Sequence, residues 1–260
     1  MYVFESVTTE LAGWIRAEVE LERELAEGAR GAAVKRVQEW LSFHNIGVVI
    51  DSDFGVATRR SVGRFQDQSG LPTTGRVDQA TFARLVEPML RVLRRHETTG
   101  NDVPAATIAY GQTHLAVHPI EIGGQNRGPW VRLYTGGKDG DAWAWCSAFV
   151  SFLMHQAAET LGQDPPIPGS VSCDSVVAQG REAGRFRSER DAQTLGVPAG
   201  SIFLVRRTAT DWTHDGLVVQ SHADTFDTIE GNTNDDGGRE GFEVCARSRN
   251  YIGKDFVLLG

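Results

Sequence analysis

The stretch "DAWAWCSAFVSF", residues 141–152, places Cys146 directly before an apolar run. Apolar residues recur at helical spacing, so the sequence predicts a helix from about Trp145 to Leu161 with Cys146 in its first turn. The free N–H groups and the dipole at a helix start favour a thiolate and lower the pKa of a thiol. The position therefore suits a nucleophile, although a small buried apolar residue is the common alternative for a free cysteine.

A nucleophilic thiol needs a base and a group that orients the base, and the later part of the chain offers both. His214 begins the predicted strand "HDGLVV", and the next predicted strand, "FDTIEGN", ends with Glu230 and Asn232. Adjacent antiparallel strands would bring these side chains together, and either Glu230 or Asn232 could fix the tautomer of His214. Each residue alone is an ordinary strand-end residue, whereas the ordered set Cys, His and Glu-x-Asn predicts a triad-like site.

The order of the predicted elements indicates an α+β fold. Helical patterns fill the first two thirds of the chain, and strands such as "GSIFLVRR" and "YIGKDFVLL" follow. Residues 8–27 show helical periodicity that ends at Gly28 and Gly31, and three short helices with Gly-rich turns follow them. We therefore predict an N-terminal helix within 1–30, a helical bundle over 31–93, a polar linker over 94–106 and a second domain over 107–260.

Composition limits the classes of partner and compartment. The chain has 260 residues and a formal net charge of -8, which argues against nucleic acid as the main partner. It contains no apolar run long enough to cross a bilayer, and its first residues do not resemble a signal peptide. Its three cysteines, Cys146, Cys173 and Cys245, have no disulfide or zinc spacing, so we expect a reducing compartment, with Cys173 and Cys245 as buried apolar residues. His114 and His118 lack a third ligand at a recognisable spacing, and we expect no metal or cofactor.

Residues 34–85 resemble the type 1 peptidoglycan-binding domain. The resemblance rests on "VKRVQEWL", "DSDFG", "SVGRFQ", "GLPTTGRVD" and "TFARL", which contain the matched Val37, Gln38, Leu41, Phe65 and Gln66. It implies a three-helix bundle that binds peptidoglycan. It also implies Asp53, Phe54 and Thr58 as candidate binding residues, although most matched positions read equally as core and turn residues.

Residues 107–260 resemble the CHAP amidase/peptidase family of the papain-like NlpC/P60 group. The resemblance rests on "WAWCSAFVSF", "PAGSIFLV", "THDGLVV" and "TIEGNTN". It implies a papain-like fold in which helices pack on an antiparallel sheet. It also implies Cys146 as the nucleophile, His214 as the general base and acid, Glu230 as the orienting carboxylate and Asn232 as a further polar member, with Glu230 and Asn232 both open as the third member.

The same resemblance suggests residues that shape the substrate cleft. The segment "EIGGQNRGPWV" is similar to one that precedes the cysteine in related members, which indicates Glu121, Asn126 and Arg127. Trp143 and Trp145 flank the nucleophile and could line the cleft or simply pack. Two positions depart from the family pattern. Ser147 stands where alanine is common, and Asp215 follows the histidine, where it could influence the histidine pKa.

Together these features predict a peptidoglycan hydrolase that cuts an amide in the stem peptide, the cross-bridge or the MurNAc–L-Ala linkage. An acyltransferase with the same site and a non-catalytic wall-binding adaptor are the alternatives. Without a visible leader, we expect synthesis in the cytoplasm and action on the cell wall after release or export. A phage endolysin or an antibacterial effector, with an export apparatus or an immunity protein as partner, would fit. The sequence does not identify the bond that is cut.

Overall fold

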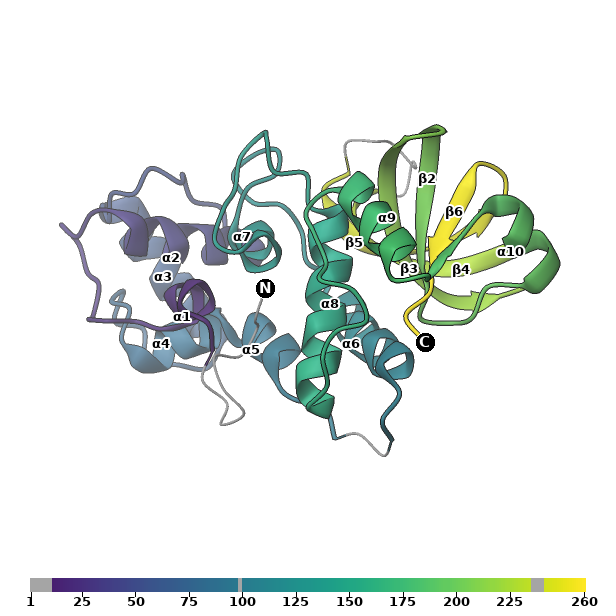
Figure 1. Cartoon of the computed structure of the whole chain (residues 1–260). Coiled ribbons are helices and arrows are strands. Elements are labelled where there is room, and N and C mark those ends of the chain that lie inside the picture. Colours follow the sequence, from purple (N-terminus) through teal and green to yellow (C-terminus); the bar gives the residue numbers. More distant parts are fainter. Residues whose placement is uncertain (1–10, 98–99, 235–240) are drawn as a thin grey trace. The chain divides into compact units, whose positions relative to one another are not determined.

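The computed structural model describes residues 11–97, 100–234 and 241–260, and it divides the chain into two compact units. The helical unit consists of Gly13–Arg94 and Ile120–Asp141. The sheet unit consists of Arg95–Pro119 and Ala142–Gly260, together with the start of the chain. The chain therefore leaves the helical unit after Arg94, returns to it after Pro119 and leaves it again after Asp141, as the colours of Figure 1 allow the reader to follow.

The helical unit contains six helices. They are α1 (Gly13–Val19), α2 (Ala32–Phe43), α3 (Val56–Gln68), α4 (Gln79–Leu85), α5 (Glu87–Leu93) and α7 (Pro129–Thr135). The core is built from apolar side chains of these helices, among them Val37, Trp40, Leu41, Val62 and Phe82, each at most 3% exposed. Burial of these side chains is the main force that holds such a small bundle together.

Two buried glutamines fix the loops of this bundle. The Gln38 amide donates to Asp51 Oδ1 at 2.8 Å and accepts from the backbone N–H of Ser52 at 2.9 Å. The Gln66 amide donates to the backbone oxygen of Arg76 at 2.8 Å and accepts from the N–H of Gly75 at 2.9 Å. Since each amide satisfies backbone groups of an adjacent turn, these glutamines hold the loops that follow α2 and α3.

The predicted helix over residues 8–27 is much shorter in the structure. Among the described residues it is helical only as α1 and ends at Val19, and residues 1–10 lie outside the described part. Leu25 instead exchanges two backbone hydrogen bonds with Val77, at 3.0 and 2.8 Å, and Gly28 N–H donates to the carbonyl of Phe54 at 2.9 Å. These pairings with the bundle take up the backbone groups that a longer helix would have used, so tertiary contacts override the local periodicity.

The segment Ile120–Asp141 belongs to the helical unit, although the predicted second domain of 107–260 included it. Trp130 of α7 is fully buried against Trp40, with ring centroids 5.8 Å apart. Arg132 of α7 donates to Glu18 at 2.7 Å and to Glu39 at 2.7 Å, and both carboxylates are almost fully buried. An aromatic anchor and a buried ion cluster thus attach a segment from later in the chain to the bundle.

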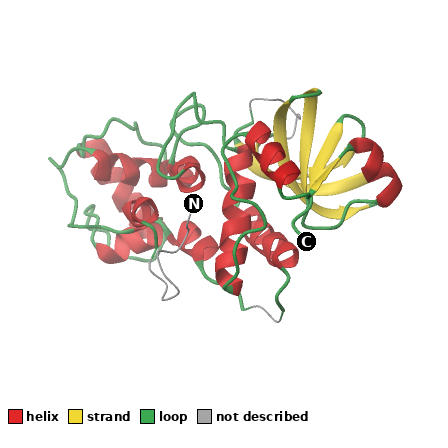
Figure 2. Ribbon diagram, viewed as in Figure 1, coloured by secondary structure: helices red, strands yellow, loops and turns green. Residues whose placement is uncertain are grey.

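In the described residues, the sheet unit combines helices with one antiparallel sheet (Figure 2). The helices are α6 (Val103–Val117), α8 (Cys146–Leu161), α9 (Cys173–Glu182) and α10 (Glu189–Leu195). The strands are β1 (Phe186–Arg187), β2 (Ile202–Thr208), β3 (Asp211–Ser221), β4 (Thr225–Thr233), β5 (Glu243–Asn250) and β6 (Lys254–Val257), in the order β1-β6-β2-β3-β4-β5. This mixed arrangement confirms the predicted α+β class. No helix in the described part of the chain is long and apolar enough to span a membrane.

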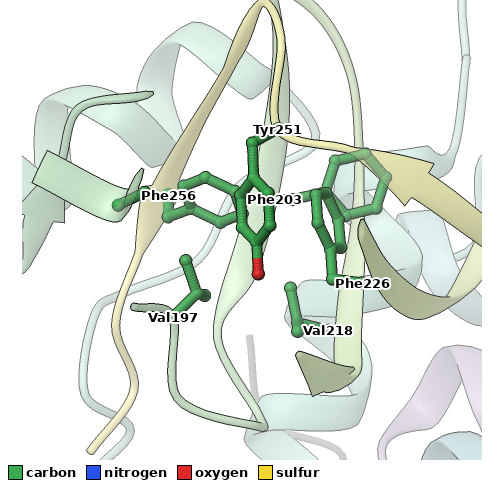
Figure 3. Packing of buried hydrophobic residues seen from close by; sticks show 7 residues of the cluster. Val197, Phe203, Val218, Phe226, Tyr251 and Phe256 are labelled. Atoms are coloured by element: carbon green, nitrogen blue, oxygen red, sulfur yellow. The ribbon is translucent and has the colours of Figure 1, made fainter. Parts of the chain in front are cut away.

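Both faces of this sheet are packed. One face carries an aromatic core in which Phe203, Phe226, Tyr251 and Phe256 meet (Figure 3). Helices α6 and α8 pack over β3 and β4, where α8 comes so close that a Cβ on Gly231 would lie 2.8 Å from Phe149 and Trp145. Helix α8 buries 13 of its 16 residues, which explains why its sequence is apolar almost all round. Its first residue is Cys146.

Candidate active site

Cys146 opens α8, as the sequence predicted, and its side chain is 6% exposed. Trp145 precedes the helix as its N-cap residue without a side-chain cap. When the Asn232 amide is oriented so that both of its ends are satisfied, its oxygen accepts from the Trp145 N–H at 3.1 Å and its nitrogen donates to the Gly241 carbonyl at 2.7 Å. Asn232 therefore holds the backbone just before the thiol.

A buried chain of groups continues from the thiol. The side chain of His214, on β3, interacts with that of Cys146, and each group shifts the pKa of the other. Its Nε2 lies 2.8 Å from Oε2 of Glu230, which is on β4 and fully buried. The structure thus brings Cys146, His214 and Glu230 together in the order that the sequence predicted, with Glu230 rather than Asn232 at the imidazole.

Arg249, on β5, is a member of this site that the sequence analysis missed. Its guanidinium donates to Glu230 through Nε at 2.6 Å and through Nη2 at 2.5 Å. Thr228 adds a third donor to the same carboxylate, at 2.7 Å. The register pairs Glu230 with Cys245 and Phe226 with Arg249, so alternation along β5 puts Arg249 on the Glu230 face. The sequence alone does not give this strand register, so it could not place Arg249 beside Glu230.

The surroundings of these groups favour a thiolate–imidazolium pair. The pKa of Cys146 is lowered well below that of an ordinary thiol by hydrogen bonds from Cys173 and His214, which outweigh burial. Burial alone would lower the pKa of His214, but its bonds to Cys146 and Glu230 raise it to about 10. Arg249 and His214 overcome the burial of Glu230 and lower its pKa to about 2. Negative and positive charges therefore alternate along this series of side chains, from the Cys146 thiolate to the Arg249 guanidinium.

The second departure from the family pattern, Asp215, faces other groups. The residue after His214 is fully buried and its carboxyl hydrogen-bonds with the hydroxyl of Ser147. That hydroxyl also donates to the sulfur of Cys173 at 3.2 Å, and the sulfurs of Cys173 and Cys146 are 4.0 Å apart. Burial, followed by the Cys146 charge, raises the pKa of Asp215 well above that of an ordinary carboxyl. The thiol therefore has a second polar neighbourhood in addition to the His214 chain.

The remaining predicted cleft residues divide between the two units. Trp145 is fully buried and Trp143 is half-buried, both in the sheet unit. Glu121, Asn126 and Arg127 lie in the helical unit, where Glu121 Oε2 accepts from the N–H of Asn126 at 2.7 Å. Arg127 makes an exposed ion pair with Asp141 at 3.4 Å. These contacts stabilise the loop before α7, and a role of the three residues toward substrate stays a prediction.

The three predicted wall-binding residues occupy different environments. Phe54 is fully buried and Thr58 is 2% exposed, so both serve the packing of the bundle. Asp53 is partly exposed and forms an ion pair with Arg30 at 2.9 Å. A separate hollow of about 560 Å³ in the same unit is lined by α1 and the start of α2, with Arg16, Arg36 and Phe82 among its walls. It contains none of the predicted site residues.

The loop-fixing glutamines and the buried core of the bundle fall within a segment that matches a known family. Residues 30–85 match the putative peptidoglycan binding domain family. This peptidoglycan-binding domain, which the sequence resemblance predicted, covers the larger part of the helical unit and supports peptidoglycan as a partner of the chain. It does not extend into the sheet unit.

Two solved structures are similar to parts of the chain. The SleB N-terminal domain shares 28% identity over 26% of this chain and 93% of its own, with a TM-score of 0.25. A fused Zn-dependent amidase/peptidase/peptidoglycan-binding domain-containing protein from Clostridium acetobutylicum ATCC 824 shares 22% identity over 36% of this chain, with a TM-score of 0.25. The match covers 44% of that second protein, less than half of its length. A search of curated proteins finds no match.

Proposed function

We propose that the chain is a peptidoglycan hydrolase whose sheet unit, a papain-like domain of the CHAP type, cuts an amide bond with Cys146 as nucleophile. The observation that carries this proposal is the buried sequence of contacts from Cys146 through His214 and Glu230 to Arg249. A thiol at a helix start, a base within hydrogen-bond reach and a carboxylate that orients the base are the parts that acyl transfer by a thiol requires. The peptidoglycan-binding domain would bind the polymer that carries such amides.

The proposed reaction has two steps. The Cys146 thiolate attacks the carbonyl carbon of the scissile amide, and the backbone N–H of Cys146 at the helix start stabilises the developing oxyanion. The C–N bond then breaks as the His214 imidazolium gives its proton to the leaving amine, which leaves a thioester. Next, His214 removes a proton from water, and the hydroxide attacks the thioester and releases the acid and the thiolate.

The positioning groups give each step its geometry. Glu230 holds Nε2 of His214, so Nδ1 is the nitrogen left for the thiol and the leaving group. Arg249 and Thr228 hold Glu230 in turn, which prevents this buried carboxylate from rotating. Asn232 fixes the N–H of Trp145, the residue directly before the nucleophile. The site therefore needs little reorganisation during the reaction.

The test compares the wild type with Cys146→Ala on purified peptidoglycan and identifies soluble products by mass spectrometry. We expect the substitution to reduce fragment release by at least about 10³-fold, because the remaining groups cannot form an acyl-enzyme. A free lactyl group in the products would indicate an amidase, and a new amine within the peptide an endopeptidase. The matched control is Cys245→Ser, a second buried cysteine of the sheet unit, which should retain activity.

Two results would contradict the proposal. Equal fragment release by Cys146→Ala would remove the thiol from the mechanism. Release by neither protein from walls of several chemotypes, with binding to the walls intact, would favour an acyltransferase or an adaptor. Adding an amine acceptor then separates these two, since only a transferase would form the new amide.

A further inference from the structure

Two side chains beside the nucleophile, those of Cys173 and Asp215, carry out no step of the proposed reaction. Cys173 is the first residue of α9, and Asp215 lies on β3. One ligand atom from each of Cys146, Cys173 and Asp215 lies within 4.8 Å of the others, and all three residues are buried. Three elements, α8, α9 and β3, therefore converge to place two sulfurs and a carboxylate around one point.

Asp215 has an unmet hydrogen-bonding requirement. It is 0% exposed, and its Oδ1 has no hydrogen-bond partner among the described residues. In the described part of the chain no arginine or lysine forms an ion pair with it, in contrast to Glu230 with Arg249 and Asp255 with Arg206. A buried carboxyl with an unsatisfied oxygen is costly, and a cation at this point would satisfy it.

We propose that Cys146, Cys173 and Asp215 form a binding site for a thiophilic divalent cation such as Zn²⁺. Thiolate and carboxylate ligands are those that Zn²⁺ takes in proteins, and two sulfurs favour it over Mg²⁺ or Ca²⁺. Three protein ligands leave the fourth tetrahedral position open to water or a further ligand.

The separation of the two sulfurs favours a metal over a disulfide. Two thiolates at about 2.3 Å from a tetrahedral Zn²⁺ are about 3.8 Å apart. The observed separation is 4.0 Å, so binding requires only a small adjustment. A disulfide needs sulfurs about 2.05 Å apart, which would require one of two buried residues to move by about 2 Å.

Binding would couple to protonation and to the reaction. Thiol and carboxyl groups ligate a divalent cation in their deprotonated forms, so binding of the ion releases protons. Affinity should therefore increase with pH. A sulfur that is bound to the ion cannot attack a carbonyl, so the occupied site is an inhibited state. This last step rests on the proposed function, whereas the binding itself does not.

Ser147 provides a matched control within the site. Its hydroxyl hydrogen-bonds with both Cys173 and Asp215. Without a bound ion, these hydrogen bonds engage the sulfur and the carboxyl that would otherwise ligate it. Ser147→Ala would remove this competitor and keep all three ligands. Cys245→Ser is the control for a buried cysteine elsewhere in the same unit.

The experiment uses the reduced, chelator-treated full chain and titrates it with Co²⁺, with Zn²⁺ as the competitor. We expect one Co²⁺ to bind with a thiolate-to-metal charge-transfer band in the near ultraviolet and to be displaced by Zn²⁺. Cys173→Ser and Asp215→Asn should weaken binding by at least the roughly 10–100-fold that loss of an outer partner costs. Ser147→Ala and Cys245→Ser should bind at least as tightly as the wild type. Circular dichroism and alkylation of Cys146 verify that each variant is folded.

Specific outcomes would overturn the proposal. Binding without the charge-transfer band, or equally tight binding by Cys173→Ser, would place the ion elsewhere. No Co²⁺ binding, together with a Cys146–Cys173 disulfide after treatment with hydrogen peroxide, would assign the pair to oxidation instead. Hydrolysis without metal binding would remove the metal site alone, and metal binding without any hydrolysis would contradict the proposed function alone.

Discussion

At the scale of single residues, the site is a line of alternating charges in a buried setting. Thiolate, imidazolium, carboxylate and guanidinium follow one another from Cys146 to Arg249, and each charge has an opposite neighbour within hydrogen-bond reach. Buried charges are tolerated when they are paired in this way. Removing one partner leaves the neighbouring charge buried and unpaired, which is strongly destabilising. The protonation of each member therefore depends on the others.

This coupling predicts an unusual pH dependence. The thiolate–imidazolium pair exists between the lowered pKa of Cys146 and the raised pKa of His214, about 10. We expect activity to persist well above the ordinary histidine pKa of about 6.5 and to fall only near pH 10. Glu230→Gln removes a charge that raises the His214 pKa, so the alkaline limb should move to lower pH. The measurement is kcat/KM against pH on a soluble muropeptide.

The matched control for this shift lies where the same two strands are connected. His222 and Asp227 form an exposed pair at 2.8 Å, so Asp227→Asn should leave the pH profile unchanged. The rate of iodoacetamide alkylation at Cys146 against pH gives the thiol pKa without any substrate. A Cys146 that titrates near 8.5, as a free thiol does, would contradict the ion pair.

At the scale of elements, α7 is held by charges as well as by packing. Arg132 meets Glu18, Glu39 and Asp139, and the first two carboxylates are almost fully buried. The pKa of Arg132 is raised because the bonds and charges of Glu18 and Glu39 outweigh its burial. This one guanidinium joins α1, α2 and the loop after α7.

Arg132→Ala should therefore destabilise the helical unit by about 3–5 kcal/mol, the usual cost of leaving a buried ion without its partner. Thermal unfolding followed by circular dichroism measures the effect. Arg127→Ala is the matched control five residues earlier in the chain. Because its partner Asp141 is largely exposed, that change should cost less than about 1 kcal/mol. Equal effects of the two substitutions would contradict the buried cluster.

The elements also show what sequence can predict and where it stops. Local periodicity and turn chemistry predicted the helix from about Trp145 to Leu161, which is α8, and three short helices over 31–93, where the structure has the four helices α2 to α5. The helix expected over 8–27 fails beyond Val19, since Leu25 pairs with Val77, a residue far along the chain. Arg249 and the Cys173–Asp215 pair could not be predicted, because strand register and the placement of α9 bring them to the thiol.

At the scale of the whole molecule, a wall-binding domain and the proposed hydrolytic site share one chain. Peptidoglycan is a polymer, so under the proposed function binding one part of it would keep other bonds close to the thiol and raise their effective concentration. Weak binding by the peptidoglycan-binding domain is sufficient for this effect. The chain passes between its two units three times after Gly13, so the unit that contains the binding domain and the unit that contains Cys146 are not separate continuous segments.

This arrangement predicts a preference for polymeric substrate. We expect cleavage of intact peptidoglycan at low enzyme concentration to exceed that of a soluble muropeptide with the same bond by on the order of 10²-fold. Gln66→Ala loosens the loop after α3 and should reduce both pelleting with peptidoglycan and this preference, while the rate on the muropeptide stays the same. A preference that survives after pelleting is lost would contradict the tether.

The return of residues 120–141 to the helical unit has a consequence for anyone who recombines such proteins. A cut in the polar stretch after Arg94 looks from the sequence like a clean junction between two exchangeable cassettes. It would separate Trp130 and Arg132 from Trp40, Glu18 and Glu39, and would leave a large aromatic ring and a guanidinium exposed on the downstream piece. A working chimera must exchange residues 13–94 and 120–141 together and keep residues 95–119 between them. The last new junction then lies after residue 141, only a few residues before Cys146.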